Sequence, residues 1–150
     1  MEIPPKVSIP ICIEQGSIYH CHLTKQNKDG TAYEGNRFFI VMNVNPKTDE
    51  ILVLVTITKK IDKVKEFIKR ICEATDTLVD ITISDFPSLS QNSVVNCNNV
   101  YSMSLEELIN KIENGGKIFR HKLPKTVIDA LIRGMMQSNQ ISPEVKGMLA

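Results

Sequence analysis

Two apolar, β-rich runs that follow one another closely constrain the fold of this chain most strongly. Residues 37–44 (RFFIVMNV) and 51–58 (ILVLVTIT) are joined by a short polar segment that contains Pro46. Runs of this length and composition, bounded by turn residues, predict strands, and their almost continuous apolar character predicts burial on both faces. The sequence therefore predicts a hairpin that is buried on both sides.

Further short strands are predicted around this hairpin. Residues 16–23 alternate, with Tyr19 and Cys21 on one face and His20 and His22 on the other, which is the two-residue period of a strand. The polar residues 27–35 contain an Asp-Gly turn dipeptide and predict a loop before the hairpin. Other segments of strand composition are residues 78–84, 93–97, 100–103 and 118–119.

Three segments predict helices. Residues 62–74 carry apolar side chains at helical spacing, with Asp62 as the expected cap. Ser104 opens a capping box for a second helix, which a Gly-Gly pair ends after about residue 113. Pro124 lies at the first turn of a final helix over residues 125–137.

Composition places the chain among ordinary globular proteins. Its 150 residues suffice for one domain with a buried core, and 42% are hydrophobic while 23% are charged. The formal net charge is only +1, so affinity for nucleic acid requires a local basic patch. The four cysteines form no Cys-x-x-Cys pair and are expected to be reduced thiols in a cytoplasmic protein. No apolar run approaches the length of a membrane span.

An arginine and a hydroxyl at the ends of neighbouring strands predict a phosphate site. Arg37 follows the polar residues Glu34-Gly35-Asn36 at the expected mouth of one strand, and Thr58 ends the next. Arginine offers planar bidentate donors to phosphoryl oxygens and keeps its charge. A lysine pair directly after Thr58 adds positive charge. This combination favours chemistry on RNA.

The order of several landmarks resembles the MazF/PemK toxins of type II toxin–antitoxin systems, over roughly residues 16–138. The landmarks are Gly16-Ser17-Ile18-Tyr19, Gly35-Asn36-Arg37, Thr56-Ile57-Thr58, the segment 89–95, the helix start Ser104-Leu105 and the closing helix 125–137. The resemblance implies an α+β fold, an SH3-like barrel of the MazF/PemK/CcdB type with peripheral helices, usually a homodimer. Residues 1–15, which contain three prolines, are then an extended arm or short edge strand, and residues 139–150 a short tail.

The resemblance also implies an activity: a metal-independent endoribonuclease (mRNA interferase) that cuts single-stranded RNA, needs no cofactor and is inhibited by a cognate antitoxin. The family's catalytic arginine and threonine fall on Arg37 and Thr58, and its glutamate falls near Glu34. The chain departs from the family pattern at Phe38, where proline is typical, and at Lys59. A non-catalytic barrel that binds a protein partner or RNA therefore stays open as an alternative.

Cleaving RNA without a metal requires removal of the 2′ proton, neutralisation of the phosphoryl oxygens and protonation of the leaving oxygen. Glu34, His20 and His22 are the available bases, and Glu34 ranks first by its position. Stacking on aromatic rings and contacts to phosphates would hold the RNA. The residues expected to bind it are Tyr33, Asn36, Lys59, Lys60, Lys63, His20 and His22.

The segment His20-Cys21-His22 also permits a zinc hypothesis. A closed zinc site needs four ligands and a catalytic one three from the protein. Cys12 and His121 are the only other ligands that could come close, and neither has a recognisable spacing. Two partly exposed strand histidines without a metal are the favoured interpretation.

Overall fold

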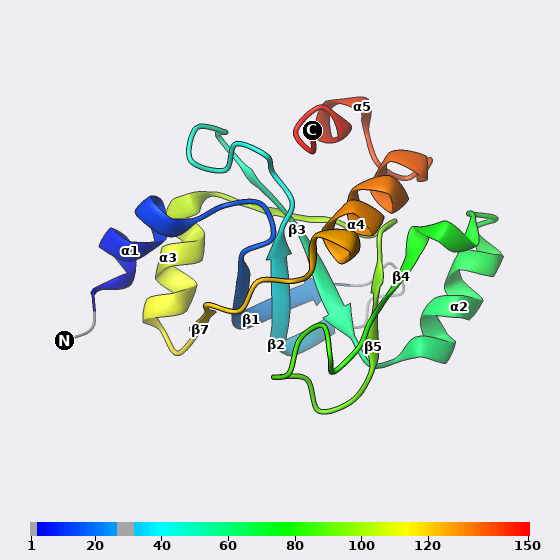
Figure 1. Ribbon diagram of the computed structural model, residues 1–150, viewed down its shortest axis with the longest axis horizontal. Coiled ribbons are helices and arrows are strands. Elements are labelled where there is room, and N and C mark those ends of the chain that lie inside the picture. Colours follow the sequence, from blue (N-terminus) through cyan, green and yellow to red (C-terminus); the bar gives the residue numbers. More distant parts are fainter. Residues whose placement is uncertain (1–2, 27–31) are drawn as a thin grey trace.

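Seven strands form a single antiparallel sheet in this computed structural model, which describes residues 3–26 and 32–150, with only the backbone of residues 25, 26, 32 and 33. The order is β4-β5-β3-β2-β1-β7, and β6 pairs with the other end of β3 (Figure 1). The strands are β1 (Ile18–Gln26), β2 (Ala32–Val41), β3 (Leu52–Thr58), β4 (Leu78–Ile81), β5 (Ser93–Asn96), β6 (Tyr101–Met103) and β7 (Lys117–Phe119). Strand pairs between the described residues do not close into a ring, so the closed barrel stays a prediction.

The predicted central hairpin is confirmed as β2 and β3. The two strands pair from Phe38 opposite Ile57 to Val41 opposite Leu54. Phe39, Ile40 and the run Leu52–Val55 are almost completely buried. Because successive side chains point to opposite faces of a strand, burial of consecutive residues means that both faces of the sheet are covered.

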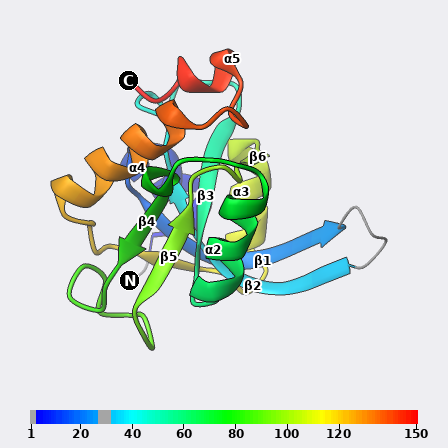
Figure 2. The same cartoon turned by 90° about the vertical axis from the view of Figure 1, so that its right-hand side faces the viewer.

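A separate hydrophobic core lies on each face. One combines alternate residues of β2 and β3, such as Ile40 and Val55, with α4 (Lys125–Gln137). The other combines Phe39 and Leu54 with α1 (Pro5–Cys12) and α3 (Leu105–Glu113). Figure 1 shows α1 and α3 side by side at one end of the molecule and α2 (Ile61–Arg70) at the other, and Figure 2 shows α4 next to β4.

The predicted helices near residues 104–113 and 125–137 are confirmed. The Ser104 hydroxyl accepts a hydrogen bond from the Glu107 backbone N–H at 3.1 Å, as the capping box predicts. Pro124 stands at the N-cap of α4, and Leu131 and Met135 are buried on its inner face.

The prediction of an extended arm at the N-terminus is wrong. Pro5–Cys12 forms the helix α1, whose buried residue Ile9 and following residue Ile13 pack in the core beside α3. Pro5 suits the first turn of a helix, which needs no N–H there, and Pro10 is tolerated inside this short one. The predicted short tail also contains structure, because α5 (Pro143–Lys146) and the buried Leu149 lie within it.

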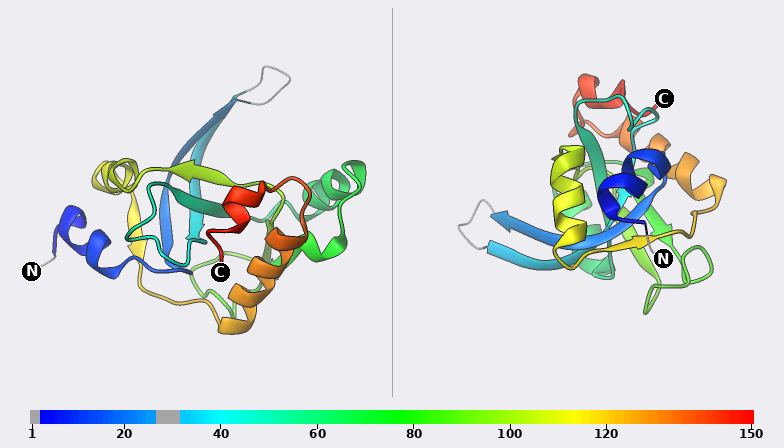
Figure 3. Two further views of the ribbon diagram at one scale, coloured as in Figure 1. Left: turned by 90° about the horizontal axis from the view of Figure 1, so that it is seen from above. Right: turned by 90° about the vertical axis from the view of Figure 1, so that its left-hand side faces the viewer.

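Arg37 does not lie at the mouth of its strand, as the sequence predicted. β2 begins at Ala32, so residues 32–35 are strand rather than loop, while residues 27–31 lie outside the described part of the chain. β1 pairs with the whole of β2, from Ile18 opposite Ile40 to Gln26 opposite Ala32. β1 and β2 therefore extend past the end of β3, and Figure 3 shows them projecting from the body.

Strand β2 also ends earlier than predicted, at Val41 rather than residue 44. Beyond that point, the side chain of the buried Asn43 makes hydrogen bonds in place of a further ladder pair. Its side-chain oxygen accepts a hydrogen bond from Val53 N–H at 2.6 Å, and its amide donates to Ile51 O and Asp49 Oδ2, both at 2.9 Å.

Two further boundaries differ from the prediction. The helix expected over residues 62–74 ends at Arg70, and Asp62 lies in its first turn while Lys60 is the N-cap. Cys72, with a φ of 58°, takes a left-handed conformation that stops the helix. β4 ends at Ile81, because the Asp85 carboxylate accepts hydrogen bonds from the Thr82 N–H and hydroxyl and forms a turn.

Strands were correctly predicted near residues 93–97, 100–103 and 118–119, now β5, β6 and β7. β5 and β6 do not pair with each other across the intervening turn; each pairs with a different end of β3. The 3₁₀ helix η1 (Thr75–Thr77) precedes β4. Over the described ranges, the structure contains no helix with the length and apolar character needed to cross a membrane.

Candidate functional site

The strand register brings Arg37 and Thr58 to the same end of the β2–β3 ladder. The last pair of this ladder is Phe38 and Ile57, so Arg37 and Thr58 are the next residue on each strand. Strand alternation places their side chains on the same side of the sheet. From this point β2 pairs only with β1, and the two strands separate.

A cavity of about 170 Å³ lies where the strands separate. Arg37 and Thr58, both half-buried, line it together with Lys59. Strand alternation places His20, Asn36, Phe38 and Ile57 on the opposite face from Arg37, so residues of both faces reach the cavity at this end of the ladder. The complete lining is His20, Asn36, Arg37, Phe38, Ile57, Thr58, Lys59, Leu89, Ser90 and Ser93.

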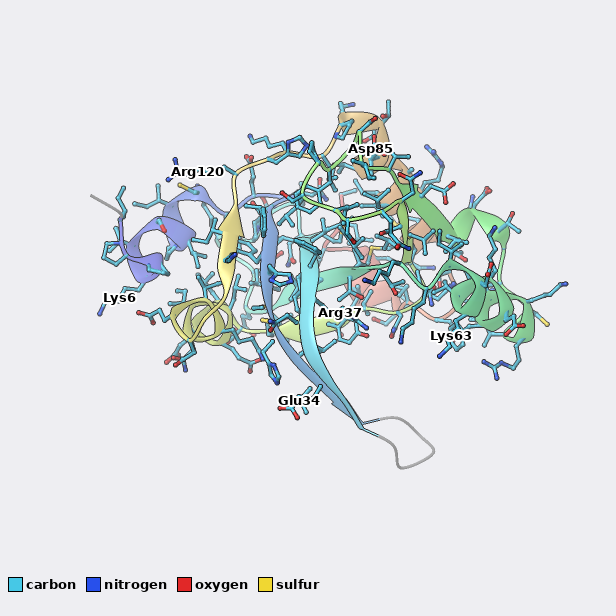
Figure 4. The ribbon with its side chains drawn as sticks, turned by 90° about the horizontal axis from the view of Figure 1, so that it is seen from below. Lys6, Glu34, Arg37, Lys63, Asp85 and Arg120 are labelled. Atoms are coloured by element: carbon cyan, nitrogen blue, oxygen red, sulfur yellow. The ribbon has the colours of Figure 1, made fainter. Side chains whose placement is uncertain are left out.

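The charge of this lining is entirely positive. Arg37 and Lys59 are cationic, and among the described residues no aspartate or glutamate belongs to the lining. The Thr58 hydroxyl also accepts a hydrogen bond from the Lys60 backbone N–H at 3.2 Å, which shapes the turn into α2. Lys60 and Lys63 are exposed nearby on this turn and helix, and Figure 4 shows Lys63 on α2. The arrangement suits an anion.

His20 is the histidine that belongs to the cavity. Its ring packs on Phe38, with centroids 4.5 Å apart, and meets the edge of Phe119 at 6.4 Å. Burial, and then the charge of Lys117 opposite it on β7, lower the pKa of the imidazole below its ordinary value. His20 is therefore neutral at pH 7.

Glu34, the base ranked first from sequence, is not brought to the cavity. It lies three residues from Arg37, on the part of β2 that extends past the end of β3, and it does not belong to the cavity lining. Its carboxylate is 73% exposed and lies 3.2 Å from His22 Nε2. Figure 4 shows Glu34 on the projecting part of the strand, beyond Arg37. His22 also lies outside the cavity lining, and the Tyr33 side chain falls outside the described part of the structure.

Sequence reasoning missed several lining residues. Phe38 was expected as a departure from the family pattern and as a ring on which a base could stack, not as part of this cavity. Leu89, Ser90 and Ser93 were placed in a family landmark and, for Ser93, in a predicted strand. These three come from a loop and strand about fifty positions after Arg37, so spacing alone gave no signal. A larger cavity of about 380 Å³, between β4 and α4, includes none of the predicted site residues.

The zinc hypothesis gains no support from side-chain geometry. Across residues 3–26 and 32–150, no group of three His, Cys, Asp or Glu side chains is arranged to hold a metal ion. His121, one of the two extra ligands considered, has its Nε2 2.7 Å from the Asp85 carbonyl oxygen instead.

Comparison with known proteins places the chain in a family. The family described as "PemK-like, MazF-like toxin of type II toxin-antitoxin system" matches residues 14–138. The chain belongs to this toxin family. Its fold is similar to that in the crystal structure of MazE-MazF (Form-III) from Deinococcus radiodurans, with 13% identity and a TM-score of 0.53 over 87% of this chain and 98% of that one. No curated protein sequence matches it.

Membership of the MazF-like toxins confirms the resemblance that the sequence landmarks carried. The match includes β1, β2 and β3 and therefore every residue that the cavity takes from these strands. Helix α1 ends at Cys12 and precedes the matched segment, as α5 follows it. Both helices lie outside the residues that match the family.

Proposed function

We propose that this MazF-like toxin is an endoribonuclease that cleaves single-stranded RNA by attack of a 2′-hydroxyl on the adjacent phosphorus, without a metal ion. The observation that carries the proposal is the position of Arg37 and Thr58, which follow the last pair of the β2–β3 ladder and line one cationic cavity. Family membership supplies the toxin class.

The chemistry follows from the donors in the cavity. In the transition state, negative charge grows on the phosphoryl oxygens, and fixed donors aimed at it lower the barrier. The Arg37 guanidinium offers two parallel N–H donors to these oxygens. The Thr58 hydroxyl donates to a phosphate oxygen or to the leaving oxygen. Because no carboxylate belongs to the lining, an anionic substrate meets no like charge there.

The RNA is held outside the cavity as well. Lys59, Lys60 and Lys63 follow the end of β3 and contact phosphates, which gives affinity without sequence information. Asn36, exposed on β2, meets a base edge. Tyr33 and His22, further along the hairpin, are the other residues proposed to bind RNA.

The same proposal includes a partner and an assembly. An antitoxin binds and inhibits the toxin in the cytoplasm; the structural relative from Deinococcus radiodurans, whose crystal structure is of MazE-MazF, supports such a partner. A homodimer and a closed SH3-like barrel, as in the family pattern, complete the proposed architecture.

Incubation of the purified protein with a long single-stranded RNA in EDTA tests the activity. Wild type should cut the RNA and spare a 2′-deoxy substrate, and Arg37→Ala should reduce the rate by about 10²–10³-fold, the usual loss on removing one transition-state donor. Arg133→Ala, an exposed arginine on α4, is the matched control and should cut normally. Intact RNA with the wild-type protein would instead favour a non-catalytic toxin that binds a protein partner.

A further inference from the structure

We infer that His20 is the group that accepts the 2′ proton during cleavage, in place of the carboxylate Glu34. This inference rests on the proposed nuclease function and names one of its catalytic residues. It comes from the position of the imidazole at the cavity and from its ring nitrogens, which make no hydrogen bond within the described residues.

The three histidines of the chain differ in what their rings contact. His22 Nε2 lies 3.2 Å from both Thr24 Oγ1 and Glu34 Oε1, and His121 Nε2 lies 2.7 Å from the Asp85 carbonyl oxygen. Within the described residues, the ring nitrogens of His20 make no hydrogen bond, and the ring is held by Phe38 and Phe119 instead. Of the three histidines, only His20 lines the cavity that contains Arg37. Its nitrogens are thus available to a substrate.

The charges around His20 keep it ready to accept a proton. Lys117 on β7 is its cross-strand partner, and Arg37 on β2 and Lys59 after β3 line the same cavity. The charge of Lys117 disfavours the imidazolium. Burial acts in the same direction and lowers the pKa of His20. A general base must be unprotonated at the working pH, and this environment supplies that state.

The step balances without an added reactant. The 2′-hydroxyl gives its proton to a ring nitrogen of His20 while the 2′ oxygen forms a bond to phosphorus. The bond between phosphorus and the 5′ oxygen breaks, and this oxygen takes a proton from solvent. The imidazolium then returns its proton to solvent, which leaves a 2′,3′-cyclic phosphate and a 5′-hydroxyl end.

The pH dependence of kcat/KM for RNA cleavage tests the inference. Wild type should lose activity as the pH falls, with a midpoint below the ordinary histidine pKa of 6.5, because protonated His20 accepts no proton. His20→Gln should lower the plateau by about 10²–10⁴-fold and remove this acid limb. His121→Gln, outside the cavity, should keep both the rate and the limb. Added imidazole should partly restore His20→Ala but not Arg37→Ala.

The alternatives give different results. An acid limb that survives in His20→Gln and disappears in Glu34→Gln would overturn the inference and return the role to the carboxylate. A purely structural role for His20 would lower the melting temperature of His20→Gln and leave the shape of the pH profile unchanged, which would also overturn it. If wild type leaves RNA intact, the nuclease proposal fails and this inference fails with it.

Discussion

At the scale of single residues, Asn43 fixes the connection between β2 and β3. Its side chain is completely buried and makes three hydrogen bonds, with the backbone of Ile51 and Val53 and with the Asp49 carboxylate. These hydrogen bonds hold the two strands together at the end of the hairpin, as a further ladder pair would. The register of the two central strands, and hence the position of Arg37 and Thr58 at the end of the ladder, begins at this anchor.

Asn43→Ala should therefore lower the free energy of unfolding by about 1–3 kcal/mol, because it leaves the buried Val53 N–H and Ile51 carbonyl without a partner. Urea denaturation followed by circular dichroism measures the change. Asn110→Ala, an exposed position on α3, is the control and should stay within about 0.5 kcal/mol of wild type. Equal effects of the two substitutions would show that the hydrogen bonds contribute nothing specific.

At the scale of elements, α1 packs against the rest of the protein through one side only. Ile9 and Ile13 are 1% exposed and lie in the core that α3 covers, whereas Ile11 is 64% exposed. Removing side-chain volume from the inner side leaves a cavity, and removing it from the outer side leaves none.

Ile9→Ala should destabilise the protein by about 2–5 kcal/mol, and Ile11→Ala by no more than about 0.5 kcal/mol. The two residues have the same type and belong to the same helix, so the difference isolates burial. Chemical denaturation of both variants gives the comparison. A helix that only loosely touches the body would instead give two small and similar values.

An element could be predicted where the residues that determine it lie close together in the sequence. The β2–β3 hairpin, the Ser104 cap and α4 carry their patterns within a few residues, and all three were predicted correctly. Helix α1 was missed because its prolines argued against regular structure. The burial of Ile9 and Ile13 depends on α3, which lies far along the chain. The early start of β2 was missed because the sequence predicted one polar loop over residues 27–35, whereas pairing with β1 makes residues 32–35 part of the strand.

At the scale of the whole molecule, the candidate site combines segments that the sequence keeps far apart. Arg37, Thr58 and Lys59 could be predicted because each lies next to a recognisable strand. That Leu89, Ser90 and Ser93 line the same cavity could not be predicted, because it depends on how the loop before β5 folds against the ladder. Glu34 was ranked by its nearness in sequence to Arg37, but it lies on the part of β2 that extends past the end of β3, outside the cavity lining.

The distribution of charge also belongs to this scale. The formal net charge is only +1, but Lys59, Lys60 and Lys63 form a local positive cluster after β3. If the cluster binds RNA, the logarithm of the binding constant should fall linearly with the logarithm of salt concentration. Replacing Lys60 and Lys63 by glutamine should reduce that slope by about 0.7 for each lost phosphate contact. Anisotropy titrations with 2′-O-methyl RNA measure it. Lys47→Gln, in the loop between β2 and β3, should leave the slope unchanged, and an unchanged slope in the double variant would contradict the contacts.

The register of β2 and β3 determines whether Arg37 and Thr58 reach the same cavity. A slip of one residue between β2 and β3 would turn every side chain of β2 to the other face and carry the guanidinium away from the hydroxyl. A copy in which these two strands pair out of register would therefore lose the arrangement of Arg37 and Thr58 at the cavity. If that arrangement is the proposed catalytic site, activity requires both strands to be synthesised and paired in this one register.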